Sequence, residues 1–192
     1  MNDWPHCIVS YIDLIGIKRE LQAQKNEVIS IIKRLHQIVY DEVNGSMAHH
    51  EFAYSWNDSV VLLAYLNGQP KSFEPIMREV NELKQHINNL CRCYAISVKG
   101  MAIPEPIQFH SQLIPGSVVD NSKHIYIKAS SMALANCFNI EEEFGRMYKK
   151  SWYVDSRIAK KIRIHQTPFI RRIRMLPTRQ KRQVFMYDRD LW

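Results

Sequence analysis

Residues 6–15, HCIVSYIDLI, form an apolar stretch that contains one carboxylate. Seven of these ten residues are apolar, aromatic or cysteine, which is typical of a strand with both faces covered. Asp13 interrupts the run. An unpaired carboxylate in such a place costs on the order of several kcal/mol, so we expect Asp13 to be protonated, to have a polar partner or to bind a metal ion.

The order of apolar patterns along the chain predicts an α/β fold. The predicted elements are a strand at 6–15, a helix over 17–42, strands at 51–56 and 59–66, a helix over 72–90, strands at 94–103 and 124–128, a helix from 130 or 131 to just before 145, and a strand at 151–154. This order fits an α+β sandwich, in which helices pack on a mostly antiparallel sheet. We expect one domain over residues 1–192, with a final stretch that is helical near 157–162 and extended near 183–188.

A two-residue connection, Asn57-Asp58, joins the second and third predicted strands. Both residue types tolerate the positive φ angles that tight hairpin turns require, so Asp58 is expected at the tip of a β-hairpin. The long helix before this hairpin brings the chain back toward the first strand. Asp58 can therefore lie beside Asp13.

Two neighbouring carboxylates favour a bound cation. At about 4 Å they repel by roughly 4 kcal/mol at an effective dielectric of 20, so either one is protonated or a cation binds both. Carboxylate oxygens suit Mg²⁺ or Mn²⁺, which also bind substrate phosphates. Gly16 and the following helix N-terminus could approach those phosphates. The alternative remains open that Asp13 caps this helix and Asp58 is a turn residue.

The composition is that of a chain with enough interior for a core and no need for disulfides. Its 192 residues include four cysteines without a disulfide-framework spacing: Cys7, Cys91, Cys93 and Cys137. The longest purely apolar or aromatic run, residues 60–66, is far too short to span a membrane. We expect a reduced, cytoplasmic protein with no membrane segment.

Positive charge is concentrated in residues 157–192. The whole chain carries a formal net charge of +7, and this region has eleven Lys or Arg residues against two Asp residues. Apolar and aromatic residues such as Phe169 and Phe185 interleave with the charges. The region is therefore either a folded basic surface or a binding surface for a polyanion, and the sequence leaves both open.

Two segments together resemble one family. The stretch YIDLIGIK, residues 11–18, is similar to the first-strand signature of class III nucleotidyl cyclases. The stretch YSWNDSVVL, residues 54–62, resembles the metal-binding hairpin of the same family, and the long helix between the two also matches. The resemblance implies a class III cyclase-like fold over about residues 6–155.

The resemblance also implies roles for five residues. Asp13 and Asp58 would be catalytic and would bind two Mn²⁺ or Mg²⁺ ions per site, with the backbone carbonyl of Leu14 as a further metal ligand. Gly16 and Ile17 would offer backbone N–H groups to the triphosphate of the substrate. The reaction would convert a nucleoside triphosphate to a 3′,5′-cyclic monophosphate and pyrophosphate.

The residue four positions before Asp58 bears on the choice of base. Purine cyclases of the family typically have a Lys there that helps to read adenine, whereas this chain has Tyr54. In this respect it looks like the small bacterial pyrimidine cyclases of Pycsar anti-phage systems. That likeness implies UTP, or else CTP, as substrate, and a cyclic UMP messenger acting on a separate effector. Tyr54 can equally be a cross-strand core aromatic beside Phe52 and Trp56.

Two further segments resemble the family with departures. SVKGMAI, residues 97–103, resembles a strand that often reads Arg-Gly-Ala-Ile, so Lys99 is expected to contact substrate. Many class III cyclases have an Asn and, four residues later, an Arg that steadies the transition state; this chain has Ala133 and Cys137 there. Arg146 is one possible replacement. The family completes each site from two chains or domains, which implies a homodimer.

Other functions remain as alternatives. The chain could be a nucleic-acid-binding protein that uses its basic C-terminal region, with Asp13 and Asp58 serving structural roles. It could be a catalytically inactive cyclase relative, given Ala133 and Cys137. A different two-metal enzyme on a palm-like fold is a further alternative, although the chain has no GGDEF hairpin.

Overall fold

The computed structural model describes residues 5–23, 26–66, 68, 72–102, 131–145, 150–176, 178 and 180–192. Its strands are β1 (His6–Leu14), β2 (Phe52–Trp56), β3 (Ser59–Tyr65), β4 (Cys93–Met101), β5 (Trp152–Asp155), β6 (Phe169–Met175) and β7 (Gln180–Tyr187). Its helices are α1 (Ile17–Gln22), α2 (Asn26–Gly45), α3 (Glu74–Leu90), α4 (Met132–Ile140) and α6 (Ser156–Ala159), and the π-helix η1 (Glu141–Gly145) continues α4.

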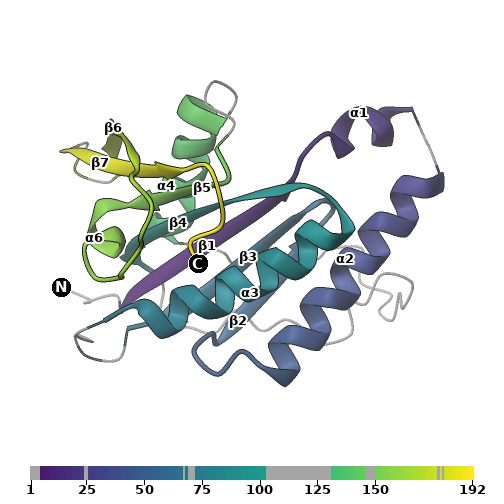
Figure 1. Cartoon of the computed structure of the whole chain (residues 1–192), viewed down its shortest axis with the longest axis horizontal. Coiled ribbons are helices and arrows are strands. Elements are labelled where there is room, and N and C mark those ends of the chain that lie inside the picture. Colours follow the sequence, from purple (N-terminus) through teal and green to yellow (C-terminus); the bar gives the residue numbers. More distant parts are fainter. Residues whose placement is uncertain are drawn as a thin grey trace.

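The described strands form one seven-stranded sheet in the order β2-β3-β1-β4-β5-β7-β6 (Figure 1). Neighbouring strands are antiparallel except β4 and β5, which run parallel. This is the mixed α/β architecture with a mostly antiparallel sheet that the sequence predicts. β1 lies between β3 and β4, and its residues 7–12 are all buried, so Asp13 is held at the end of a strand that cannot shift independently.

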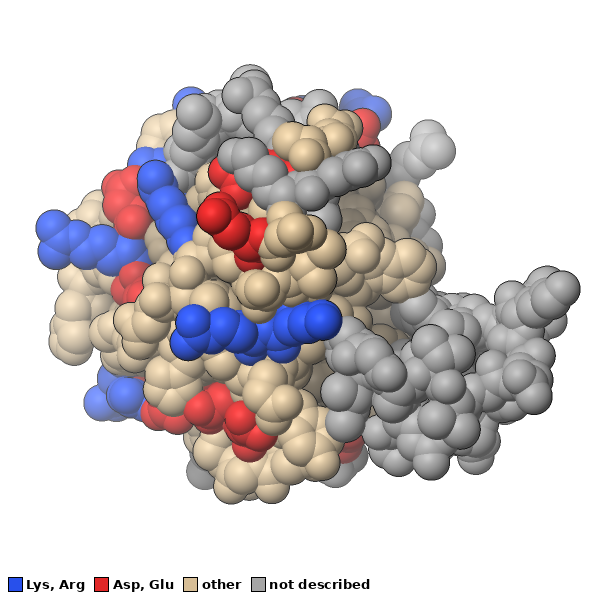
Figure 2. Space-filling model, turned by 90° about the vertical axis from the view of Figure 1, so that its right-hand side faces the viewer, with Lys and Arg blue, Asp and Glu red and all other residues tan. Residues whose placement is uncertain are grey.

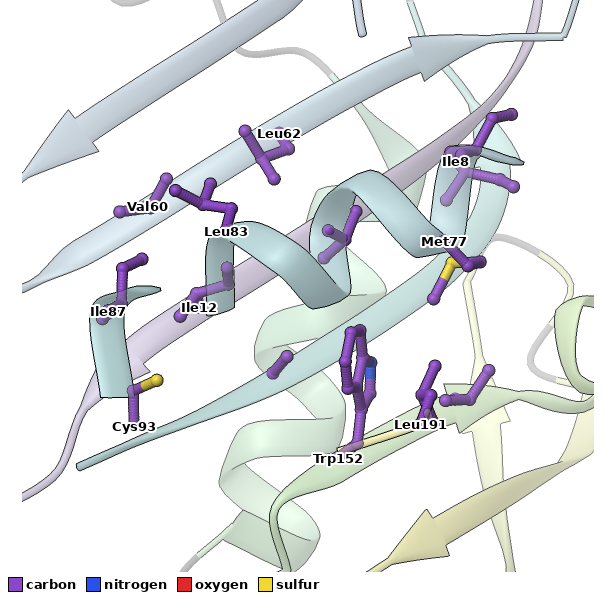
Figure 3. Close-up of a cluster of buried hydrophobic side chains, with 14 of the residues drawn as sticks. Ile8, Ile12, Val60, Leu62, Met77, Leu83, Ile87, Cys93, Trp152 and Leu191 are labelled. Atoms are coloured by element: carbon purple, nitrogen blue, oxygen red, sulfur yellow. The ribbon is translucent and has the colours of Figure 1, made fainter. Parts of the chain in front are cut away.

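Helices cover both faces of the sheet. α2 and α3 lie along one face, where side chains of α3 pack on Ile8, Ile12 and Leu62 (Figures 1 and 3). The other face carries α4, whose buried residues pack against Cys7 and Val9. Alternate residues of β1 therefore belong to two separate cores, as expected for a strand whose side chains point alternately to opposite faces. Asp13 lies an even number of positions along β1 from Cys7 and Val9, so its side chain points to the same face of the sheet, the face that carries α4.

α4 approaches the sheet unusually closely at one point. A Cβ built on Gly100 of β4 would lie 2.8 Å from the Cβ of Ala133 and 3.0 Å from its backbone nitrogen. Real Cβ atoms do not approach other heavy atoms so closely, so the glycine permits this contact. The contact fixes the height of α4, and with it η1, above the sheet.

Several predicted elements differ from those observed. The single helix predicted over 17–42 is two helices, α1 and α2, and α2 runs on to Gly45. The helix predicted to stop before Gly145 changes from α-helical to π-helical hydrogen bonding at Glu141, a change that apolar spacing does not reveal. β6 was not predicted. The strand predicted at 124–128 lies outside the described residues.

The basic C-terminal region folds into the sheet. β6 and β7 form an antiparallel hairpin at one edge, and β6 exposes Arg171, Arg172 and Arg174. Charged side chains on an edge strand discourage pairing with other strands. Figure 2 shows the other side of the molecule, away from this hairpin, where Lys and Arg side chains lie among Asp and Glu side chains. Within the described part of the chain, no helix is long and apolar enough to cross a membrane.

The close contact between α4 and β4 predicts a cost for enlarging Gly100. We expect Gly100→Ala to lower the free energy of unfolding by about 1–3 kcal/mol, because the new methyl group meets Ala133. Gly45→Ala is the matched control, since a Cβ there has no neighbour within 4 Å. Urea unfolding should show a change of less than about 0.5 kcal/mol for that control. Equal changes in both variants would contradict the close packing.

Candidate active site

The tip of the β2–β3 hairpin lies beside the end of β1, as predicted. Asp13 is directly opposite Ser59 in the β1–β3 register, and the Leu14 N–H donates to the backbone oxygen of Asp58 at 3.0 Å. The turn is the predicted two-residue connection, with Asn57 at a φ of 50°. His36 of α2 contacts the Asn57 carbonyl through Nε2 at 3.0 Å. The sheet and α2 together therefore fix Asp58 next to Asp13.

Three hydroxyl groups surround the Asp13 carboxylate. Its Oδ1 accepts hydrogen bonds from Ser59 Oγ at 2.6 Å and from the Tyr11 hydroxyl at 3.2 Å. Its Oδ2 lies 3.1 Å from the Tyr94 hydroxyl, and Tyr11 and Ser59 also contact each other at 3.1 Å. Asp13 is thus held in one orientation by neutral groups, and no cationic side chain is among these partners.

The charge of Asp13 is unfavourable in this setting. The pKa of Asp13 is raised to about 6: burial is the largest cause, the negative charges of Asp58 and Glu141 add to it, and hydrogen bonds from Ser59 and Tyr94 oppose it. Hydroxyl hydrogen bonds therefore compensate only part of the cost of burying this carboxylate. A cation between Asp13 and Asp58 would relieve both the burial cost and the repulsion.

The oxygen donors at this place fit a hard divalent cation. In the part of the chain that the structure describes, no group of three or more His, Cys, Asp or Glu side chains is arranged to hold a metal. Asp13 and Asp58 alone would supply the carboxylates. Mg²⁺ and Mn²⁺ suit such a site, because they commonly use one or two carboxylates and take further oxygen ligands from water or substrate phosphates.

The sequence analysis did not single out four other residues of this cluster: Tyr11, Ser59, Tyr94 and Glu141. Tyr11 and Ser59 stand within the two motifs, two residues before Asp13 and one after Asp58, so strand pairing could have identified them. Glu141 gave no signal. Its Oε1 accepts a hydrogen bond from the Tyr94 hydroxyl at 2.7 Å, which brings a third carboxylate to the site from a distant part of the chain.

Gly16, Ile17 and Tyr54, for which substrate binding stays a prediction, lie after the end of β1, at the start of α1 and on β2, respectively. Gly16 lies two residues after the end of β1 and has a φ of 92°, a conformation that glycine adopts without strain. Ile17 begins α1 and its side chain is buried in the core, which leaves only its backbone for a ligand. Tyr54 is opposite Val61 and so shares the sheet face of Asp13. Burial raises the pKa of the Tyr54 hydroxyl above its usual range.

Lys99 does not join the cluster within one chain. It lies five residues along β4 from Tyr94, roughly 17 Å at the usual rise of a strand, and its side chain points to the opposite face. Its ammonium lies 5.3 Å from the ring centre of Phe73. Burial lowers the pKa of Lys99, and the nearby charges of Arg157 and Lys161 lower it further. The expected contact of Lys99 with substrate is therefore not supported in a single protomer.

Ala133 and Cys137 lie on the face of α4 that is fully buried against the sheet. Cys137 Sγ lies 3.8 Å from the carbonyl oxygens of Val9 and Ile96, and burial raises the pKa of this thiol well above its ordinary value. These two positions therefore face the core, and larger polar side chains would not fit there without rearrangement. Arg146, the suggested replacement, lies outside the described residues.

A separate pocket of about 570 Å³ lies between η1 and the β6–β7 hairpin. Its lining contains both acidic and basic side chains: Asn139, Glu142, Glu143, Arg172, Ile173, Arg174 and Lys181. Neither Asp13 nor Asp58 lines it. An anion in this pocket would meet glutamates as well as arginines, so the pocket is not a simple basic site.

Comparison with solved structures identifies the fold. A bacterial light-regulated adenylyl cyclase aligns over 99% of this chain with a TM-score of 0.59 at 10% identity, and this chain spans 54% of that protein. The guanylyl cyclase Cya2 aligns over 99% of this chain and 98% of its own, with a TM-score of 0.53 at 11% identity. This chain has the class III nucleotidyl cyclase fold.

The cyclase fold is recognised from structure and not from overall sequence. CyaB of P. aeruginosa, an adenylyl cyclase, also aligns over 98% of this chain and 97% of its own, with a TM-score of 0.52 at 10% identity. No protein-family model matches the sequence, and no curated protein matches it in sequence. At these identities the alignments establish the arrangement of strands and helices, and the chemistry must be argued from the residues.

A divalent cation should stabilise the protein only when both carboxylates are present. We expect Mn²⁺ at 100 times its dissociation constant to raise the free energy of unfolding of the wild type by about 2.7 kcal/mol. Asp58→Asn should abolish this gain. Asp41→Asn, which changes an exposed aspartate on α2, should keep it. Thermal unfolding with and without Mn²⁺ measures the effect, and an equal gain in Asp58→Asn would show that the ion binds elsewhere.

The raised pKa of Asp13 predicts a pH dependence in the absence of divalent cations. The folded state holds a proton on Asp13 up to about pH 6, whereas the ordinary pKa is 3.8. The free energy of unfolding of the wild type should therefore fall, relative to that of Asp13→Asn, as the pH rises from about 4 to 6. Above that range the difference between the two free energies should stay constant. Urea unfolding in a chelating buffer at several pH values tests this. A difference that does not change with pH would show that Asp13 titrates normally.

Proposed function

We propose that this protein is a metal-dependent nucleotidyl cyclase that converts a pyrimidine nucleoside triphosphate to its 3′,5′-cyclic monophosphate and pyrophosphate. UTP is the favoured substrate and CTP the second choice. The observation that carries the proposal is the pairing of Asp13 with the Asp58 turn at the end of β1, on a fold shared with solved adenylyl and guanylyl cyclases.

Within this proposal, Asp13, Asp58 and the Leu14 carbonyl would hold two Mn²⁺ or Mg²⁺ ions. Ions bound there would supply a more nucleophilic ribose 3′-hydroxyl and would neutralise charge on the phosphates. Ser59 orients the Asp13 carboxylate through a hydrogen bond of 2.6 Å. The backbone N–H groups of Gly16 and Ile17 would bind the triphosphate, which positions the α-phosphorus for attack by the hydroxyl.

The base would be read on the sheet face that carries Tyr54. This face has Trp56 and Tyr54 side by side on β2, at alternate positions of one strand. A purine-reading Lys is replaced by Tyr54, which narrows the space and removes a charge. This supports a smaller pyrimidine base. Lys99 takes no part in this proposal within the protomer, because it lies on the opposite face.

A homodimer would complete the site. Trp56 is 61% exposed and Phe138, which packs edge to face against Tyr11, is 47% exposed, so apolar surface lies near the carboxylate pair. A second copy docked on this face would cover these side chains and could contribute groups that Ala133 and Cys137 do not provide. A two-fold symmetric dimer would have two equivalent sites.

The biological role we propose is that of a second-messenger enzyme in anti-phage defence. Its cyclic pyrimidine nucleotide would activate a separate effector protein. This part of the proposal rests on the sequence likeness at Tyr54 and at the two motifs. It depends on the nature of the product, which the experiment below identifies.

A nucleic-acid-binding function is the second candidate, and one observation favours it. Strand β6 exposes Phe169 and Ile170 next to three arginines at the sheet edge, a combination that can contact bases and phosphates. Glu142 and Glu143 oppose these charges across the neighbouring pocket. A strongly salt-dependent affinity for DNA or RNA that survives Asp58→Asn would support this function instead.

The proposed activity can be tested with four nucleotides. Purified protein is incubated separately with ATP, GTP, CTP and UTP in the presence of Mn²⁺, and the products are identified by mass. We expect cyclic UMP from the wild type and from Asp41→Asn, and a rate at least about 100-fold lower from Asp58→Asn. Cyclic AMP or cyclic GMP as the main product would refute the pyrimidine assignment. No cyclic product from any nucleotide would indicate an inactive cyclase relative.

A further inference from the structure

The π-helix η1 presents Glu141 to the carboxylate pair. Isolated π-helical turns are uncommon in proteins and often occur at functional sites. Two tyrosines of neighbouring strands hold this one: the Tyr94 hydroxyl donates to Glu141 Oε1 at 2.7 Å, and the Tyr153 hydroxyl donates to the Phe144 carbonyl at 3.4 Å. The two rings pack edge to face with centres 6.3 Å apart. The position of Glu141 is therefore set by the sheet and not by the helix alone.

Tyr94 lies between two carboxylates but has one proton to donate. Its hydroxyl oxygen is 2.7 Å from Glu141 Oε1 and 3.1 Å from Asp13 Oδ2. A phenol can donate only one hydrogen bond, so the two carboxylates compete for it. The shorter distance favours Glu141 as the acceptor.

The two oxygens of Asp13 are unequally engaged. Oδ1 accepts from Ser59 and Tyr11, and these two hydroxyl groups also contact each other. Within the described part of the chain, Oδ2 has the Tyr94 hydroxyl as its hydrogen-bonding neighbour. Whether Oδ2 can serve as a metal ligand without first losing a hydrogen bond therefore depends on where the Tyr94 proton points.

We propose that Glu141 is a positioning residue. By accepting the hydrogen bond of the Tyr94 hydroxyl, it keeps Asp13 Oδ2 available to a divalent cation. Without an acceptor at position 141, Tyr94 donates to Asp13, and a cation must displace that hydrogen bond in order to bind. This inference rests on the proposed function, since it assigns a role at the same metal site. It adds a third carboxylate and a tyrosine whose effect is exerted through Asp13.

A direct electrostatic role of Glu141 is the competing explanation. A third negative charge near Asp13 and Asp58 would attract a cation whether or not Tyr94 is present. The two explanations differ in what they require. The positioning role needs a hydrogen-bond acceptor at 141 and a hydroxyl at 94, whereas the electrostatic role needs only the charge at 141.

Mn²⁺ binding to variants of these two residues separates the explanations. Free Mn²⁺ is measured by electron paramagnetic resonance during titration of the full chain, without any nucleotide. We expect Glu141→Leu, which has no acceptor, to weaken Mn²⁺ binding about tenfold. Glu141→Gln also lacks the charge but keeps a carbonyl acceptor, so it should weaken binding less than threefold. Glu142→Leu, at the next position of η1, should bind as the wild type does.

The double variant completes the test. In a Tyr94→Phe background, Glu141→Leu should change the Mn²⁺ dissociation constant less than twofold, because no proton remains to be redirected. Equal weakening by Glu141→Leu and Glu141→Gln, or equal weakening with and without the Tyr94 hydroxyl, would overturn the positioning role in favour of charge alone. No weakening by Glu141→Leu would also overturn it.

Failure of the proposed function gives a different result. If the wild type itself binds no Mn²⁺, or if Asp58→Asn binds it as tightly as the wild type, the metal site of the proposed function is refuted, and the role of Glu141 with it. If the wild type binds Mn²⁺ through Asp58 but the Glu141 variants behave as charge alone predicts, only the inference about Glu141 fails. Near-ultraviolet circular dichroism of each variant checks that the aromatic packing around Tyr94 is retained.

Discussion

The buried negative charge at the end of β1 is the constraint on which the rest of this structure depends. Asp13 lies near the end of a strand that is covered on both faces. Its carboxylate is close to two further negative charges, those of Asp58 in the hairpin turn and of Glu141. Hydroxyl groups of Ser59 and Tyr11 orient the carboxylate without neutralising it, and the Tyr94 hydroxyl lies between this carboxylate and Glu141. A fold that retains this unfavourable arrangement gains from a cation, and that requirement connects the packing of the sheet to the chemistry we propose.

The surrounding elements serve to hold these groups in place. The hairpin turn is fixed from two sides, by the Leu14 N–H and by His36 of α2. On the α4 face, the contact of Gly100 with Ala133 sets the height of the helix, and the π-helical turn that follows brings Glu141 into reach of Tyr94. The sequence resemblance implies polar groups at two positions of α4, and these positions are occupied here by the buried residues Ala133 and Cys137. This departure gives the partner copy or other side chains a larger role in our proposal.

Much of this arrangement could be predicted from the sequence, for identifiable physical reasons. Asp13 and Asp58 were found because an acid in an apolar strand and an Asn-Asp turn are local signals, and the hairpin joins them. The side of the sheet on which Lys99 lies could not be predicted, because strand assignment alone does not establish which face a side chain occupies; the register puts Lys99 on the face opposite Asp13, and its ammonium lies near the Phe73 ring. Glu141 could not be predicted, since its approach to Asp13 depends on a π-helical turn and on a tyrosine of another strand.

The most direct test of this account is anomalous diffraction from crystals grown with Mn²⁺, recorded at the manganese absorption edge. The account predicts a peak within coordination distance of carboxylate oxygens of both Asp13 and Asp58, close to the Leu14 backbone. The contradicting result would be the absence of a peak between the two carboxylates, in crystals that contain excess Mn²⁺ and in which both side chains are well ordered. The aspartates would then be structural, and the cyclase fold would have a different use in this protein.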